Sequence, residues 1–396
     1  MNADAVSEVA EQNRGNSPRA ALLGPYPAEP GKFRNGVESV VSALADGLAE
    51  HGVEVFVVTA DPDIKKEMRS KTPSGVNVLR LPVYGKLGNL TGFAMDVKPI
   101  RAALDEIRPD IVHIHKILIY AKAAMIPRWK SVLTVHGIHF REAALQRGWA
   151  GVRARFACRY EREALRKARH VICLNRYAVE TCGGWLKAPD VRLIDNPIDD
   201  GFFDVSIEEE QPGTILFGGS ITRRKNVLGL LGALDILAKD YPEIRLKIAG
   251  KAADEAYYQR CLDFVAGHGL QENVEFLGSL SVDAMASELG RACMLVLPSR
   301  QESAPVIISE AMAAGKPVVA TAAGGTAEMV EDGVSGFVTP INDAPALASA
   351  IGKLMNDADL RRKMGQAGKK CAESRFRRSV VVEKTIALYR DVIGEQ

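Results

Sequence analysis

Two glutamates stand eight positions apart in the segment PSRQESAPVIISEAMAAGKPVVAT, at Glu302 and Glu310. Pro305, between them, suits the first turn of a helix whose second turn would carry Glu310. Free backbone N–H groups at a helix start carry partial positive charge and bind phosphate or other anions. We therefore expect Glu310 to accept hydrogen bonds from a ribose diol and Glu302 to point at the group beyond the phosphate. In the simpler interpretation, two glutamates at this spacing in an α/β protein have no functional meaning on their own, and the case for a nucleotide site depends on the surrounding sequence.

A basic loop follows a glycine pair in the segment FGGSITRRKNVLGLL, residues 217–231. A strand is expected to end at Gly219 and a helix to begin near Asn226, so that Arg224 and Lys225 project into a cleft beside a diphosphate. Guanidinium and ammonium groups can neutralise a departing diphosphate without a metal, because the developing charge sits on phosphate oxygens. A solvated basic loop is the simpler interpretation of such a run.

Four of the seven histidines fall within 27 residues, at the ends of the predicted strands IVHIH and SVLTV. They are His113, His115, His136 and His139, and we expect them on the side that faces the cleft. A zinc site would also require carboxylate or thiolate ligands nearby, and none is patterned there. A hydrogen-bonded structural histidine is the simpler interpretation of each, and no metal is expected.

Short β-branched runs alternate with segments of helical period, which predicts parallel sheets covered on both faces. Two such series occur. The first contains ALLGPY, VEVFVVT, IVHIH, SVLTV and HVICL, and the second TILFGGS, IRLKIAG, NVEFLG, CMLVLP and PVVAT. Ligands sit beyond the carboxyl ends of parallel strands. We therefore expect an α/β fold of two Rossmann-like domains that face each other across one cleft.

The same patterns divide the chain into five parts. Three helical patterns in a row close the sequence and cannot continue a doubly wound sheet, so the last is expected to pack back on the N-terminal domain. The parts are a disordered leader at 1–17, an N-terminal domain at 18–196, a linker at 197–212, a C-terminal domain at 213–375 and a C-terminal helix at 376–396.

Composition narrows the classes of function. The 396 residues have a formal net charge of +2, which is too balanced for a whole-chain nucleic-acid binder. Six cysteines are scattered without C-x-x-C spacing, which fits a reducing compartment. The N-terminal segment does not resemble a signal peptide, and no apolar run reaches the roughly 18 residues that span a bilayer. We expect a cytoplasmic protein.

One stretch departs from this balance, because residues 141–169 hold nine arginines or lysines against three glutamates. A solvated helix face is the simpler interpretation. Such a stretch would also suit an anionic acceptor, or a peripheral contact with the anionic inner face of the cytoplasmic membrane.

The segment around the two glutamates resembles the donor-binding signature of the retaining glycosyltransferases of family 4. That signature is E-x7-E, followed by A-M-A-x-G-x-P-V-V-A and a G-G-x-x-E loop. The matching positions are Glu302, Glu310, Ala311 to Gly315, Pro317 to Ala320, Gly324, Gly325 and Glu328. The resemblance implies a GT-B fold that binds the acceptor in the N-terminal domain and the nucleotide sugar in the C-terminal domain.

The resemblance also implies roles for individual residues. TVHG resembles the motif that carries a histidine beside the reacting sugar, so the catalytic residues would be His136, Glu302 and Lys225. The loop before the first helix resembles the glycine-rich first loop of the family. The donor-binding residues would be Gly36, Gly219, Arg224, Lys225, Glu302, Ser303, Ala304, Val306 and Glu310.

Two positions depart from the family pattern. Ser220 stands where the family has an arginine, and we expect Arg223 or, more readily, Arg224 to replace it. Ala304-Pro305 stands where many members have Phe-Gly, and Pro305 has no N–H to donate.

The leading hypothesis is a metal-independent, retaining transferase of a hexosyl group. It would move the sugar from a nucleoside diphosphate, UDP before GDP, to a carbohydrate or lipid-linked acceptor in cell-surface polysaccharide or glycoconjugate synthesis. The alternatives within enzymes are an epimerase or a phosphorylase on the same fold. A metal-dependent, single-domain transferase would use Asp61-Pro62-Asp63. A non-catalytic sugar-nucleotide binder is the alternative from another class.

Overall fold

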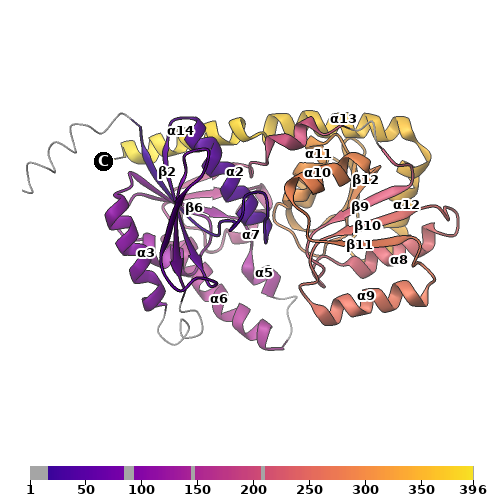
Figure 1. The fold of residues 1–396 in the computed structure, drawn as a ribbon, viewed down its shortest axis with the longest axis horizontal. Helices are drawn as coiled ribbons and strands as arrows, with labels where there is room; N and C mark the ends of the chain where they lie inside the picture. Colours follow the sequence, from indigo (N-terminus) through magenta and orange to yellow (C-terminus); the bar gives the residue numbers. More distant parts are fainter. Residues whose placement is uncertain (1–16, 84–92, 144–147, 207–209, 396) are drawn as a thin grey trace, which may run out of the picture.

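The chain forms two α/β domains that lie side by side (Figure 1). The computed structural model describes residues 17–83, 93–143, 148–206 and 210–395, with the side chains of 142 and 148–157 left out. The leader predicted for 1–17 therefore lies outside the described residues, apart from residue 17. The predicted pair of parallel-sheet domains is confirmed.

The N-terminal domain is built on an eight-stranded sheet in the order β3-β4-β2-β1-β5-β6-β7-β8. All neighbours are parallel except β3 and β4. The strands are β1 (Arg19–Leu23), β2 (Glu54–Asp61), β3 (Met68–Lys71), β4 (Asn77–Pro82), β5 (Ile111–Ile114), β6 (Ser131–Val135), β7 (His170–Cys173) and β8 (Asp190–Leu193). Its helices are α2 (Gly36–Glu50), α3 (Ala94–Ile107), α4 (Ile119–Ala124), α5 (His139–Ala143), α6 (Gly148–Lys167) and α7 (Arg176–Cys182).

The C-terminal domain has a six-stranded parallel sheet in the order β11-β10-β9-β12-β13-β14. The strands are β9 (Thr214–Gly218), β10 (Arg245–Ala249), β11 (Val274–Gly278), β12 (Met294–Leu297), β13 (Val318–Thr321) and β14 (Gly336–Thr339). Its helices, with two 3-10 turns, are η1 (Asp200–Asp204), α8 (Val227–Leu237), α9 (Glu255–Gly267), α10 (Val282–Arg291), α11 (Val306–Ala313), η2 (Gly324–Glu328), α12 (Ala344–Asn356) and α13 (Ala358–Arg375).

Local chemistry explains where several helices begin. Asn35 caps α2 by accepting from the N–H groups of the first turn, and Asp254 and Ser281 cap α9 and α10 in the same way. Gly315 has a φ of +70°, the left-handed conformation expected where α11 ends.

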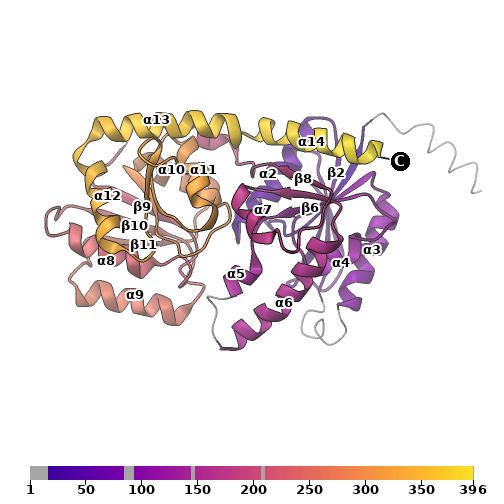
Figure 2. The ribbon, with the colours of Figure 1, turned by 180° about the vertical axis from the view of Figure 1, so that it is seen from behind.

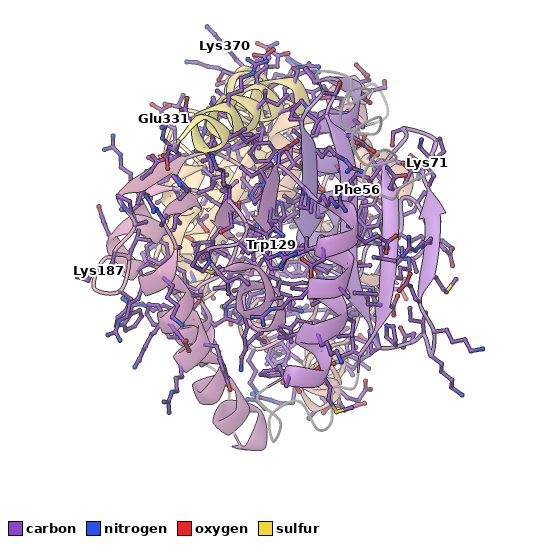
Figure 3. The ribbon with its side chains drawn as sticks, turned by 90° about the vertical axis from the view of Figure 1, so that its left-hand side faces the viewer. Phe56, Lys71, Trp129, Lys187, Glu331 and Lys370 are labelled. Atoms are coloured by element: carbon purple, nitrogen blue, oxygen red, sulfur yellow. The ribbon has the colours of Figure 1, made fainter. Side chains whose placement is uncertain are left out.

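Alternate residues of the N-terminal strands feed two cores, one on each face of the sheet. Leu23 and Ile114 belong to one core, and Leu22 and Ile111 belong to the other. A single larger core fills the C-terminal domain. Figure 3 looks along the long axis and places Lys71 of β3 and Lys187, just before β8, on opposite sides of the molecule.

The last helix, α14 (Arg378–Gly394), continues the line of α13 and runs along the N-terminal domain (Figures 1 and 2). It packs on α2, where a Cβ at Gly47 would stand 2.6 Å from a methyl of Val382. Glycine at this position allows the two helices to approach closely. The C-terminal helix thereby joins a domain that begins more than three hundred residues earlier in the chain.

Candidate active site

A cavity of about 700 Å³ opens between the two domains, at the carboxyl ends of their strands. It brings together every residue predicted for donor binding or catalysis. They are Gly36, His136, Gly219, Arg224, Lys225, Glu302, Ser303, Ala304, Val306 and Glu310. Parallel sheets place loops from distant strands at one edge, which explains how residues so far apart in the sequence line a single space.

Glu302 is the electrostatic centre of the cavity. The residue is buried, with 5% of its surface exposed. The Oε1 atom lies 2.7 Å from Lys225 Nζ and accepts a 2.7 Å hydrogen bond from Ser299 Oγ, and Oε2 lies 3.0 Å from Arg224 Nη1. Burial alone would raise the pKa of Glu302, but the Lys225 and Arg224 charges bring it below its ordinary value. Two cations face one carboxylate, so this corner favours an anion.

The loop after β9 carries these cations into the cavity. Gly219 has a φ of +143°, and a Cβ there would stand 3.2 Å from Lys225 Cε. A residue with a side chain would therefore crowd the lysine. Arg223 turns aside, with Nε 3.5 Å from Asp254 and its guanidinium over Tyr257. Of the two arginines proposed to replace the one missing at Ser220, the structure brings Arg224 into the cavity.

Helix α11 places the second glutamate. Pro305 precedes the helix in an extended conformation, and Glu310 follows in the second turn, as the spacing predicts. Burial and the charge of Asp199 raise the pKa of Glu310 to about 8. A protonated carboxyl has one O–H donor and also accepts hydrogen bonds, so it can both donate to and accept from the hydroxyls of a diol.

Ser303 offers a further contact from the same loop. It is buried, and its Oγ has no hydrogen-bond partner among the described residues. A buried hydroxyl without a partner carries a desolvation penalty that a bound ligand can relieve. Gly36 of the N-terminal domain lies close to the start of α11, because a Cβ there would stand 3.4 Å from a methyl of Val306. The two domains therefore meet closely three residues after Ser303.

His136 enters the cavity from the end of β6. Its Nε2 lies 2.9 Å from Nδ1 of His115, and the two rings stack with centroids 5.2 Å apart. Burial lowers the pKa of His136 to about 4, although a side-chain hydrogen bond with Asn196 opposes the shift. The ring is therefore neutral at physiological pH and can act as a hydrogen-bonding group.

The other predicted histidines do not all share this cavity. His115 and His139 line it, and Glu161 of α6 accepts a hydrogen bond from the N–H of His139 at 2.9 Å. The prediction that His113 faces the cleft is wrong. Its ring is buried and bonds Tyr389 and Thr134, because the side chain of a residue within the strand, one position before its last residue, still points into the sheet's packing layer.

Contacts between the domains surround the donor loop, and sequence reasoning missed them. Asn175 donates to the backbone oxygen of Ser303 at 2.6 Å. The carboxylate of Glu328 accepts from the N–H groups of Arg176 and Tyr177 at 2.9 and 2.6 Å, at the start of α7. The glutamate of the G-G-x-x-E loop is the signal that could have pointed to this contact, since carboxylates stabilise helix starts.

The alternative Asp61-Pro62-Asp63 motif has a different place. Asp61 lies 3.4 Å from Arg80, and its Oδ1 accepts from the N–H of Asp63 in a turn. Neither aspartate is among the described residues that line the cavity. Within the described part of the chain, no group of three or more His, Cys, Asp or Glu side chains is arranged to hold a metal ion. The fold also has two domains, unlike the single-domain alternative.

Two family models match the chain. "Glycosyl transferases group 1" matches residues 200–371, and "Glycosyl transferase 4-like domain" matches residues 35–197. The phosphatidyl-myo-inositol mannosyltransferase of Mycolicibacterium smegmatis is 27% identical over 393 residues, which are 95% of this chain and 94% of that protein. The glycogen synthase of Mycobacterium tuberculosis is 27% identical over 289 residues, which are 71% of this chain and 69% of that protein.

Solved structures share the fold. Sucrose-phosphate synthase from Thermosynechococcus elongatus superposes with a TM-score of 0.79 at 22% identity, covering 95% of this chain and 99% of its own. Anabaena HepE, in complex with UDP and glucose, superposes with a TM-score of 0.71 at 20% identity, covering 94% of this chain and 100% of its own. The chain therefore belongs to the group 1, family 4 glycosyltransferases, with the two-domain GT-B fold.

Proposed function

We propose that this glycosyltransferase is retaining and metal-independent, and that it moves a hexosyl group from a UDP-sugar to a carbohydrate or lipid-linked acceptor. The observation that carries the proposal is the meeting of Glu302, Arg224 and Lys225 with Glu310 in one interdomain cavity. UDP is favoured over GDP because HepE, which shares the fold, is described in complex with UDP and UDP-glucose. The resemblance of Glu302 and Glu310 to the signature of the retaining family supports the proposal of retention.

In this proposal the ribose diol bonds Glu310, and the diphosphate lies beside Arg224 and Lys225. When the anomeric C–O bond breaks, its electron pair goes to the diphosphate oxygen. The two cations stabilise that charge, and neutral His136 bonds the sugar where positive charge develops at the anomeric carbon. The acceptor hydroxyl then forms the new C–O bond and gives its proton to the departing diphosphate oxygen. Closure of the domains around the loop of Ser303 excludes water that would hydrolyse the donor.

The acceptor is proposed to lie on the N-terminal side of the cavity. A second cavity, of about 890 Å³, is lined in part by Phe140. The preceding residue, His139, lines the cavity between the domains. Its described lining includes four cations on one face of α6, namely Arg159, Arg162, Arg166 and Lys167. Such a surface favours an acceptor that carries phosphate or carboxylate groups, as in cell-surface polysaccharide or glycoconjugate synthesis.

We also propose that this basic surface of α6 makes a peripheral contact with an anionic membrane. Of the predicted basic stretch at 141–169, the side chains of 142 and 144–157 lie outside the described residues. No helix within the described ranges is long and apolar enough to cross a membrane. An anionic leaflet would attract the exposed end of α6 by charge alone.

A thermal-shift screen with UDP, GDP and ADP and their sugars tests the donor proposal. A ligand that binds only the native state stabilises it by about 2.7 kcal/mol at a hundredfold excess over Kd. UDP and UDP-sugars are expected to raise Tm in the wild type and to lose most of this effect in Glu310→Ala. The absence of a shift with every nucleotide would refute the proposal.

Product analysis then separates the alternatives. Transfer that retains the anomeric configuration, seen in the proton NMR spectrum of the product and unchanged by excess chelator, is expected for the proposed enzyme. Conversion of free UDP-sugar without an acceptor would indicate an epimerase. Binding without turnover, unchanged in the double variant His136→Ala and Glu302→Ala, would indicate a non-catalytic binder.

A further inference from the structure

Beneath the cavity, buried polar side chains join the C-terminal helix to His136. Tyr389 of α14 bonds Nδ1 of His113 at 2.7 Å, and Thr134 bonds Nε2 of His113 at 2.6 Å. The His113 ring lies against the His115 ring, with centroids 4.0 Å apart. His115 in turn bonds His136 at 2.9 Å. These contacts connect α14 to the wall of the cavity.

We infer that Tyr389 is a positioning residue for glycosyl transfer, which through His113 and His115 holds the ring of His136 in the orientation that the reacting sugar requires. This inference rests on the proposed function of His136. It assigns to the C-terminal helix a part in the active site in addition to its packing on α2.

Both nitrogens of His113 are occupied, so this ring cannot turn without breaking a hydrogen bond. Tyr389, His113 and His115 are all at most 3% exposed. In a close-packed interior, a ring held at both nitrogens restricts the movement of the tilted ring that lies against it. His115 therefore has one orientation in which its Nδ1 meets His136.

The histidines in this series are neutral, which makes their hydrogen bonds directional. Burial lowers the pKa of His113 to about 3 and that of His115 well below its ordinary range, and burial raises the pKa of Tyr389. A neutral imidazole has a single N–H, so each bond requires a particular tautomer. The His113 ring contacts the His115 ring without a hydrogen bond between them, so a change in the tilt of His113 would move Nδ1 of His115 relative to His136.

If Tyr389 only stabilises the packing of α14, any substitution that weakens this packing should disturb His136 as much as the loss of the Tyr389 hydroxyl does. Val382 provides the matched control. It is fully buried in the same helix, about two turns before Tyr389, and packs on Gly47 of α2. Val382→Ala weakens the helix contact and leaves the hydroxyl of Tyr389 in place.

The experiment compares Tyr389→Phe, His113→Phe and Val382→Ala by NMR of protein labelled with ¹⁵N-histidine, whose seven rings give few signals to assign. Hydrolysis of UDP-glucose supplies kcat and KM. Tyr389→Phe and His113→Phe are expected to move the ring ¹⁵N resonances of His136 and to lower kcat about 10-fold with little change in KM, since misplaced groups lose rate before affinity. Val382→Ala is expected to change neither.

Unmoved resonances of His115 and His136 in Tyr389→Phe would overturn the inference. Equal losses of kcat in Tyr389→Phe and Val382→Ala would also overturn it. Failure of the wild type to bind any nucleotide would instead refute the proposed function. The two failures can be told apart, because the NMR comparison is made without a donor.

Discussion

At the scale of single residues, the main feature of the cavity is one buried carboxylate whose negative charge is balanced by two cations. Glu302 would be costly to bury alone, and Lys225 and Arg224 keep it ionised at 2.7 and 3.0 Å. The three side chains act as one unit, because removal of any member leaves uncompensated charge in a buried position. A diphosphate placed beside the two cations would share them with Glu302.

Replacement of Lys225 tests this unit. Lys225→Met is expected to lower the rate of UDP release from the UDP-sugar about 100-fold, because a stabilising charge is lost where the leaving group develops its own. The pKa of Glu302 should rise, and the free energy of unfolding should fall by about 1–3 kcal/mol. Lys239→Met, at an exposed position near the end of α8, is the control. A rate within twofold of the wild type would contradict the role of Lys225.

Glu310 makes stability depend on pH. Its pKa is about 8 in the folded chain and near 4.5 in the unfolded chain, so the unfolded chain loses this proton first as the pH rises. The contribution of Glu310 to stability is therefore full below about pH 4.5 and is lost as the pH rises to about 8. Glu310→Gln should remove this loss and gain about 1–3 kcal/mol over the wild type at pH 8.

Urea unfolding of both proteins near pH 5 and pH 8 measures the difference, and the exposed Glu272→Gln is the control. If the gain from Glu310→Gln is the same at both pH values, the carboxyl is not held protonated by its surroundings.

At the scale of elements, the loop from Gly324 to Glu328 joins the donor site to the other domain. A Cβ at Gly325 would stand 2.1 Å from the backbone oxygen of Ser303 and 2.2 Å from Nδ2 of Asn175. Only glycine fits between them. The element that holds the donor and the element that meets the N-terminal domain therefore share one tight contact.

Gly325→Ala is expected to push this loop away from both neighbours, because backbone atoms cannot yield as a flexible side chain can. We expect a loss of about 1–3 kcal/mol in the free energy of unfolding and a clear loss of UDP affinity, measured by calorimetry. Gly333→Ala is the control, since a Cβ there meets nothing within 4 Å and the backbone strain is its only cost. Equal affinities for UDP in the two variants would contradict the proposed link between the Gly325 contact and donor binding.

The sequence predicts the elements where the pattern is strong and local. The spans of α2 and α11 and the central strands follow from periodicity and caps. Strands β3, β4, β8 and β14 are not predicted from the sequence. Strand β3 is exposed on every residue and β8 is only partly buried, whereas the apolar run of β4 is interrupted by Arg80 and β14 has only four residues. Contacts such as Glu328 with α7 depend on how the domains are placed, which no local pattern encodes.

At the scale of the whole molecule, two kinds of connection join the domains. Helices α13 and α14 run along both of them (Figures 1 and 2). Closer to the cavity, Asn175, Tyr177 and Glu328 link the two walls directly. The helices are continuous chain, whereas the hydrogen bonds near the cavity can break when the cavity opens. Exchange of donor and product would therefore require these hydrogen bonds to break and form again.

Glu328→Ala removes two hydrogen bonds from the start of α7 and is expected to favour the open arrangement. We expect a larger radius of gyration in small-angle scattering without ligand, and KM for the UDP-sugar raised about 10-fold, because closure must be recovered on binding. Glu331→Ala, in an exposed position three residues later, is the control. Identical scattering and KM in the two variants would show that this contact does not hold the domains together.

The most direct test of the central claim is a crystal structure of the protein with UDP. The account predicts the ribose hydroxyls within hydrogen-bond distance of Glu310, and the diphosphate beside Arg224 and Lys225 in the cavity between the domains. UDP bound elsewhere, or bound in the cavity with its ribose away from Glu310, would contradict it.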